Sequence, residues 1–126
     1  MLHFPQQLLL GSATLMGFLA VALGAFAAHA LKQRLEHDMF AIYEVGVRYQ
    51  TYHVLAMALA VWISTVTPGP WALWAGWVFF GGILIFSGSL YALALSGIRT
   101  FGAITPIGGL LLLLGWILLT IAAFKR

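Results

Sequence analysis

Four long apolar stretches, separated by short polar segments, dominate this sequence. They run from about 4 to 30, 40 to 64, 71 to 95 and 104 to 124. A helix needs about 20 apolar residues to cross the roughly 30 Å of hydrocarbon in a bilayer, and each stretch meets that length. The sequence therefore predicts an all-α integral membrane protein with four transmembrane helices.

The composition excludes a water-soluble domain of this size. Hydrophobic residues make up 63% of the 126 residues, whereas Asp, Glu, Lys and Arg together make up 7%. Too few polar side chains remain to cover a surface that faces water. The net charge of +3 suits anionic lipid headgroups, and no nucleic-acid partner is expected.

Short connections join the apolar stretches. The segment "LKQRLEHD" (31–38) is polar, "TPGP" (67–70) has the composition of a tight turn, and "SGIRTFGA" (96–103) contains two glycines and an arginine. Loops this short place consecutive helices side by side. We therefore expect a single domain over residues 1–126, built as one bundle of four antiparallel helices.

Glycines at seven-residue spacing predict where these helices touch. There is little hydrophobic drive between helices in lipid, so small residues that permit close backbone approach mark contact faces. The expected packing glycines are Gly17, Gly24, Gly81, Gly88, Gly108 and Gly115.

The second apolar stretch has a polar beginning, "RYQTYH" (48–53). At 100° per residue, Glu44 and Arg48 share one helix face, while Tyr49 and His53 lie together on another. Glu44 and Arg48 are four residues apart, a spacing that favours an ion pair. We expect Arg48 to be an interfacial anchor, with binding of a lipid headgroup or a partner subunit as the alternative.

Aromatic residues cluster where an interface between membrane and water is expected. Such belts of tyrosine and tryptophan need no further function. The expected members are Tyr43, Tyr49, Tyr52, Trp71, Trp74 and Trp77.

His53 is the most unusual residue of the second stretch. It would lie about 20 Å along the helix from Phe40, well inside the hydrocarbon. An imidazole there needs a hydrogen-bond partner. We expect a serine, a threonine or a backbone carbonyl on a neighbouring helix, with proton or ligand chemistry as the alternative. The candidate polar cluster comprises Glu44, Arg48, Tyr49, Gln50, His53, Ser87, Ser89 and Thr105.

No motif in the sequence indicates a cofactor. The chain has no cysteine and no HExxH motif. His29 lies near the end of the first stretch, at a different expected depth from His53, so the two are poorly placed to share a haem or a metal ion. We expect no metal and no cofactor.

Four blocks of the chain occur in the order of a known family. They are "GAFAAHAL" (24–31), "YQTYHVLAMAL" (49–59), "FSGSLYALALSG" (86–97) and "ITPIGGLLLLLGW" (104–116). The chain resembles the small four-helix membrane proteins grouped as domain of unknown function 423, which include bacterial YgdD-like proteins and the eukaryotic transmembrane protein 256. One departure is Ala27, where that family commonly has glycine. The resemblance implies four membrane helices and, for a bacterial member, the plasma membrane, without an established reaction or ligand.

Three functional classes agree with these features. We favour a non-enzymatic structural or accessory membrane component, acting as an oligomer or as a subunit of a larger complex, with lipids and membrane proteins as partners. A small-solute or proton transporter acting as an oligomer is the alternative. An intramembrane enzyme would require His53 and Glu44 to converge on one cavity, although they lie on different helix faces.

Overall fold

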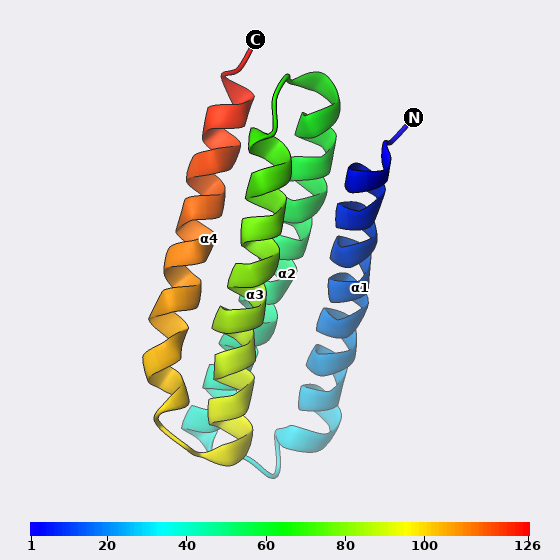
Figure 1. Cartoon of the computed structure of the whole chain (residues 1–126). Helices are drawn as coiled ribbons and strands as arrows, with labels where there is room; N and C mark the ends of the chain where they lie inside the picture. Colours follow the sequence, from blue (N-terminus) through cyan, green and yellow to red (C-terminus); the bar gives the residue numbers. More distant parts are fainter.

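The computed structural model describes all 126 residues and consists of helices joined by short turns. Consecutive helices run in opposite directions, and both termini lie at the same end (Figure 1). The predicted all-α class is confirmed. The helices are α1 (Phe4–Phe26), the π-helix η1 (Ala27–Leu31) that extends it, α2 (His37–Val66), α3 (Trp71–Ser96) and α4 (Phe101–Ala123).

The helices pack as a row rather than as a closed square. α3 lies between α2 and α4, α1 packs mainly against α2, and α1 and α4 do not pack against one another (Figure 1). The main core nevertheless draws side chains from all four helices, and Leu9, Met57 and Phe79 are fully buried in it. α2 and α3 therefore form the centre of the molecule.

Two helices begin one turn earlier than the sequence indicated. α2 starts at His37 instead of near residue 40, and α4 starts at Phe101 instead of near residue 104. The polar residues His37 and Asp38 are compatible with a start of α2 that projects beyond the apolar region, and Asp38 interacts favourably with the positive helix end. Pro106 lies inside α4.

Three helices are long and apolar enough to cross a membrane. They are Phe4–Leu31, Trp71–Ser96 and Phe101–Ala123. α2 has 30 residues but does not meet that criterion, because side chains such as Arg48, Gln50 and His53 lower its mean hydropathy. The sequence predicted four spans, of which three are supported by length and composition.

Four of the expected packing glycines lie at helix contacts. A Cβ added at Gly108 would sit 2.3 Å from the backbone nitrogen of Phe86, and one added at Gly115 would sit 2.5 Å from the ring of Phe79. α3 and α4 therefore approach closely at both points. Gly17 and Gly24 of α1 face Val54 and Val47 of α2, at 3.4 and 3.3 Å from the added Cβ.

Gly81 and Gly88 do not mark points of close approach between helices, which corrects the expectation from the sequence. A Cβ at either position would meet nothing within 4 Å. The contacts of α3 are made instead by Gly76 and Gly82, which face Leu9 and Leu112. A seven-residue spacing is nearly two turns, so it places two glycines on a common face without saying which face meets a neighbour.

We predict that Gly108→Ala lowers the free energy of unfolding by about 1–3 kcal/mol, because the new methyl group would collide with the backbone of α3. The matched control is Gly88→Ala, whose methyl group meets open space. This control should be neutral or slightly stabilising, since alanine favours a helix over glycine by about 1 kcal/mol. Thermal denaturation in detergent measures both, and equal losses would contradict the assigned contact.

Candidate functional site

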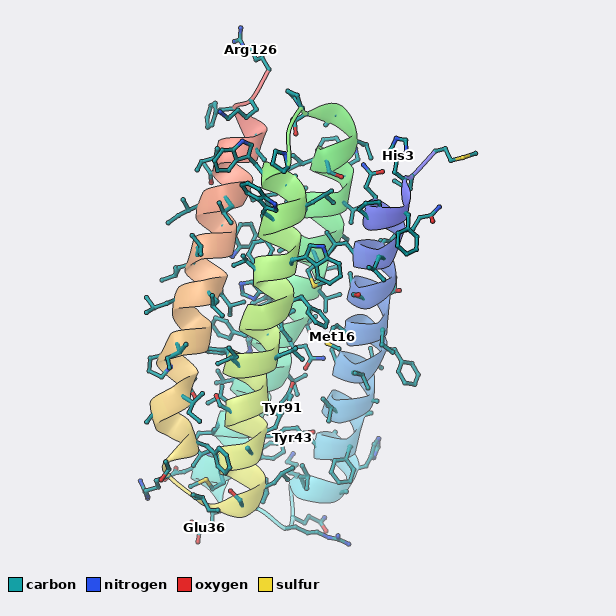
Figure 2. All side chains as sticks on the ribbon, viewed as in Figure 1. His3, Met16, Glu36, Tyr43, Tyr91 and Arg126 are labelled. Carbon is teal, nitrogen blue, oxygen red and sulfur yellow. The ribbon has the colours of Figure 1, made fainter.

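Gln50 joins three helices through its side-chain amide. Only 3% of the residue is exposed. Its Nε2 donates to the Met16 carbonyl oxygen of α1 at 2.9 Å, and its Oε1 accepts from the Tyr91 hydroxyl of α3 at 2.7 Å. Figure 2 labels Met16 and Tyr91 in the space between α1 and α3. The amide is thus satisfied at both ends, which fixes its orientation.

Two further hydroxyl groups form hydrogen bonds between the same pairs of helices, α1 with α2 and α2 with α3. The Tyr43 hydroxyl donates to the Leu23 carbonyl oxygen of α1 at 2.8 Å, and the Ser87 hydroxyl of α3 donates to the Gly46 carbonyl oxygen of α2 at 2.7 Å. The rings of Tyr43 and Tyr91 lie 5.0 Å apart (Figure 2). We call the side chains of Gln50, Tyr91, Tyr43 and Ser87 the Gln50 network.

Tyr43 was expected in an interfacial aromatic belt, and this expectation is wrong. The residue is fully buried at 0% exposure, because its ring packs against Tyr91 and its hydroxyl reaches α1. Tyr49 and Tyr52 are exposed, at 39% and 53%.

His53 faces α4 instead of joining the Gln50 network. Its Nδ1 lies 2.7 Å from the Tyr49 carbonyl oxygen, and its Nε2 accepts from the Trp116 indole N–H at 3.1 Å. An indole can only donate, so Nε2 carries a lone pair and the proton resides on Nδ1. This hydrogen-bond pattern assigns a neutral imidazole with both nitrogens engaged.

The expected serine and threonine partners of His53 bond elsewhere. Ser87 belongs to the Gln50 network, and Ser89 bonds to Thr105 at 2.6 Å, which links α3 to α4. His53 instead finds its partners in its own helix and in Trp116. The buried polar residues of the predicted cluster, Gln50, His53, Ser87 and Ser89, therefore take part in separate helix contacts rather than lining one cavity.

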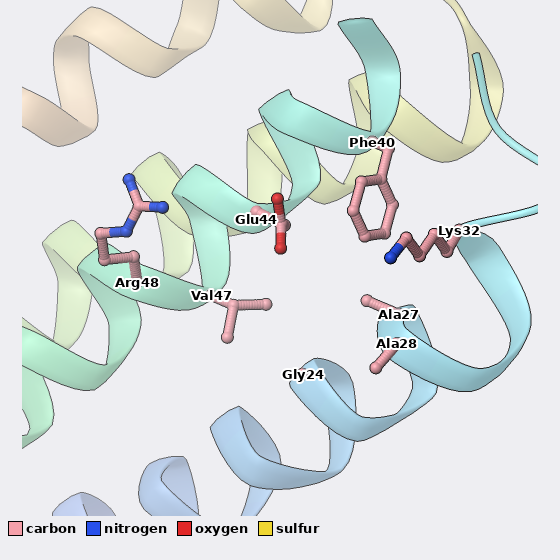
Figure 3. Close-up of a pocket in the computed structure, with 8 residues that line it drawn as sticks. All are labelled: Gly24, Ala27, Ala28, Lys32, Phe40, Glu44, Val47 and Arg48. Carbon is pink, nitrogen blue, oxygen red and sulfur yellow. The ribbon is translucent and has the colours of Figure 1, made fainter. Parts of the chain in front are cut away.

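Glu44 and Arg48 are exposed and form no ion pair, contrary to expectation. Figure 3 shows the carboxylate and the guanidinium apart. Exposed pairs at this spacing are worth only about 0.3–0.5 kcal/mol, which is too little to hold two long side chains together.

These two side chains line a charged pocket between η1 and α2. The pocket has a volume of about 360 Å³ and receives Lys32 from the opposite wall (Figure 3). We call it the Lys32–Arg48 pocket. Its remaining lining residues are Gly24, Ala27, Ala28, Phe40 and Val47.

A second, apolar groove of about 550 Å³ lies between α2 and α4. His53 and Trp116 form part of its wall, and Pro106 and Gly109 leave room on the α4 side. No group of three His, Asp or Glu side chains lies close enough together to hold a metal ion.

Sequence reasoning missed three polar contacts. Tyr91 lies four residues after Ser87, so helix periodicity alone could have placed it on the same face. Nothing in the sequence marked Trp116 as the hydrogen-bond donor to His53, because tryptophan is common in membrane helices. Gln6 of α1 donates to the Ser64 hydroxyl at 3.1 Å, and neither residue was singled out.

Residues 23–109 match the model of a family described as a protein of unknown function (DUF423). The chain belongs to this family. The UPF0382 membrane protein of Staphylococcus saprophyticus is 47% identical over 111 residues, which cover 88% of this chain and 92% of that protein. The UPF0382 membrane protein YwdK of Bacillus subtilis is 40% identical over 108 residues, covering 85% and 88%. No solved structure matches.

The family supports the class of protein indicated by the helices. Its bacterial members are named membrane proteins, and the present chain has three helices apolar enough to span a bilayer. The DUF423 protein described here is therefore a multi-pass membrane protein.

We predict that Tyr91→Phe lowers the free energy of unfolding by on the order of 1 kcal/mol, because Gln50 Oε1 loses its donor inside the bundle. The control is Tyr52→Phe, which removes a hydroxyl from an exposed ring and should leave stability unchanged. Chemical or thermal unfolding in detergent compares the two. Equal effects would show that the Tyr91 hydroxyl does not tie α3 to α2.

Proposed function

We propose that this DUF423 protein is a non-enzymatic structural or accessory component of the bacterial plasma membrane, with all four helices crossing the bilayer as one antiparallel bundle. α2 is the one helix that is less apolar than a typical membrane span. It lies between α1 and α3 and runs antiparallel to both (Figure 1), so it occupies the same depth as two helices that are apolar enough to span. Its buried polar groups, Gln50 and His53, are bonded to neighbouring residues and do not face lipid.

The main support for the proposed role is that the buried polar side chains are bonded to one another or to the backbone. Every buried side-chain nitrogen and oxygen atom has a hydrogen-bond partner within the chain. Gln50 and His53, the groups best suited to move a proton or bind a solute, already have both of their polar atoms engaged. A transport path or an active site would have to break these bonds, which in a membrane interior leaves polar groups without partners.

The outer surface is where such a component would act. Large apolar side chains on α1 are exposed, including Phe18 at 70% and Val21 at 74%. α1 packs on one side only and leaves the rest of its surface to lipid, to another membrane protein or to a second copy of the chain. The proposed partners are therefore membrane lipids and membrane-protein subunits.

We predict that reporters fused to the two termini lie on the same side of the membrane, and that a reporter inserted at Gln33 lies on the opposite side. Four spans return the chain to its starting side, whereas three would not. Accessibility of the reporters in intact cells and in inverted vesicles measures this. Termini on opposite sides would contradict a membrane-spanning α2.

We also predict that purified protein in proteoliposomes gives no proton or solute flux above that of empty vesicles. Purification in mild detergent should in turn recover it as an oligomer or in a larger membrane complex. A pH-sensitive dye and native mass spectrometry provide the two readouts. A proton flux that His53→Phe abolishes would overturn the structural role in favour of transport.

A further inference from the structure

The Lys32–Arg48 pocket lies at the end of the bundle opposite the two termini, where η1 leads into the connection to α2 (Figures 1 and 3). At 1.5 Å per residue, Glu44 is about 10 Å and Arg48 about 16 Å from the start of α2. A helix of 30 residues is about 45 Å long and exceeds the hydrocarbon by roughly 7 Å at each end. The Cα atom of Glu44 therefore lies about 3 Å, and that of Arg48 about 9 Å, inside the boundary between headgroups and hydrocarbon.

The charges in this pocket lack partners within the chain. Glu44, Arg48 and Lys32 are all exposed and none forms an ion pair. Charged groups at this depth are costly unless they are paired or reach the interface. Arg48 and Lys32 have long side chains that can extend outward, whereas the shorter Glu44 cannot. A ligand that brings both signs of charge into the pocket would remove this cost.

The shape of the pocket comes from the residues of α1 and η1. Gly24, Ala27 and Ala28 line one wall of the pocket with little or no side chain, and the π-helical turn of η1 lies at this point. Such turns are rare in helices and often occur at functional sites. Phe40 and Val47 of α2 provide an apolar surface next to the charges.

We propose that the Lys32–Arg48 pocket binds the headgroup of a phosphatidylethanolamine molecule. The phosphate contacts the two cations, the primary ammonium group donates hydrogen bonds to Glu44, and the glycerol and upper acyl carbons contact Phe40 and Val47. This assignment goes beyond the proposed structural role, which names no particular lipid. The lipid assignment and the structural role can each be wrong without the other, because a structural protein need not select a headgroup.

The chemistry of the pocket separates this lipid from other phospholipids. Phosphatidylglycerol carries a phosphate but no cation, so it offers Glu44 only neutral hydroxyl donors, whose hydrogen bonds are weaker than those of an ammonium group. Phosphatidylcholine carries a quaternary ammonium group without an N–H donor, so it cannot form the charge-assisted hydrogen bond to the carboxylate. Selectivity for a primary ammonium therefore depends on Glu44, and overall affinity depends on Lys32 and Arg48.

Native mass spectrometry of delipidated protein with the three lipids, each carrying the same acyl chains, tests the proposal. The native chain should bind phosphatidylethanolamine at least about tenfold more tightly than the other two lipids. This factor is the effect expected from losing one charge-assisted hydrogen bond, the one between the ammonium group and Glu44. Glu44→Gln should abolish this preference while retaining lipid binding. Arg48→Gln should weaken binding of all three lipids.

Two controls distinguish the pocket from general charge effects. Arg99→Gln removes an exposed cation from the α3–α4 connection at the same end of the bundle and should leave binding unchanged. Ala28→Leu fills the pocket without altering charge and should weaken binding. All four altered residues are exposed, and unchanged thermal denaturation of each variant confirms that it folds.

Three results would overturn the proposal. The first is equal binding of the three lipids by the native chain, and the second is a loss in Arg99→Gln as large as that in Arg48→Gln. The third is displacement of the lipid by the same concentration of water-soluble glycerophosphoethanolamine, which would identify a soluble ligand in place of a membrane lipid.

Discussion

The hydrogen bonds that α2 makes to its neighbours hold this fold together, because a membrane interior offers no water to satisfy polar groups and little hydrophobic drive between helices. α1 shows the dependence most clearly, since it packs mainly on α2 and does not reach α4. Three bonds attach it along its length: Gln6 to Ser64, the Met16 carbonyl to Gln50, and the Leu23 carbonyl to Tyr43. α3 and α4 are joined differently, by close backbone approach at Gly108 and Gly115, with the bond between Ser89 and Thr105 as the polar addition.

The polar residues 48–53 of α2 take part in several separate contacts rather than in one site. Gln50 points toward α1 and α3, His53 bonds to Trp116 of α4, and Arg48 lies outside the bundle. These side chains lower the hydropathy of α2 below that of the other helices, yet the buried ones are satisfied within the chain. The charges that face outward are free to meet the lipid headgroups.

The sequence was sufficient for the helical class and for the approximate place of each helix, because long apolar stretches and short polar connections determine both. It could not give the rotation of each helix about its axis. The same seven-residue spacing was therefore right for Gly108 and wrong for Gly88, whose added Cβ would meet open space. For the same reason Tyr43 was assigned to the interface although it is buried, and Trp116 was not recognised as the partner of His53. Contacts between helices depend on rotation and relative depth together, and neither is encoded in the spacing along one helix.

A double-mutant cycle on Gln50 and Tyr91 measures whether the hydrogen bond between them holds α2 to α3. Gln50→Leu, Tyr91→Phe and the double variant are compared with the native chain by unfolding in detergent, so that the energy specific to the pair separates from the loss of each side chain. We predict a coupling energy on the order of 1 kcal/mol, as for other hydrogen bonds between membrane helices. Losses that add to within about 0.3 kcal/mol, as they do for independent sites, would contradict it and leave only the bond from Ser87 to Gly46 and packing to hold α2 and α3 together.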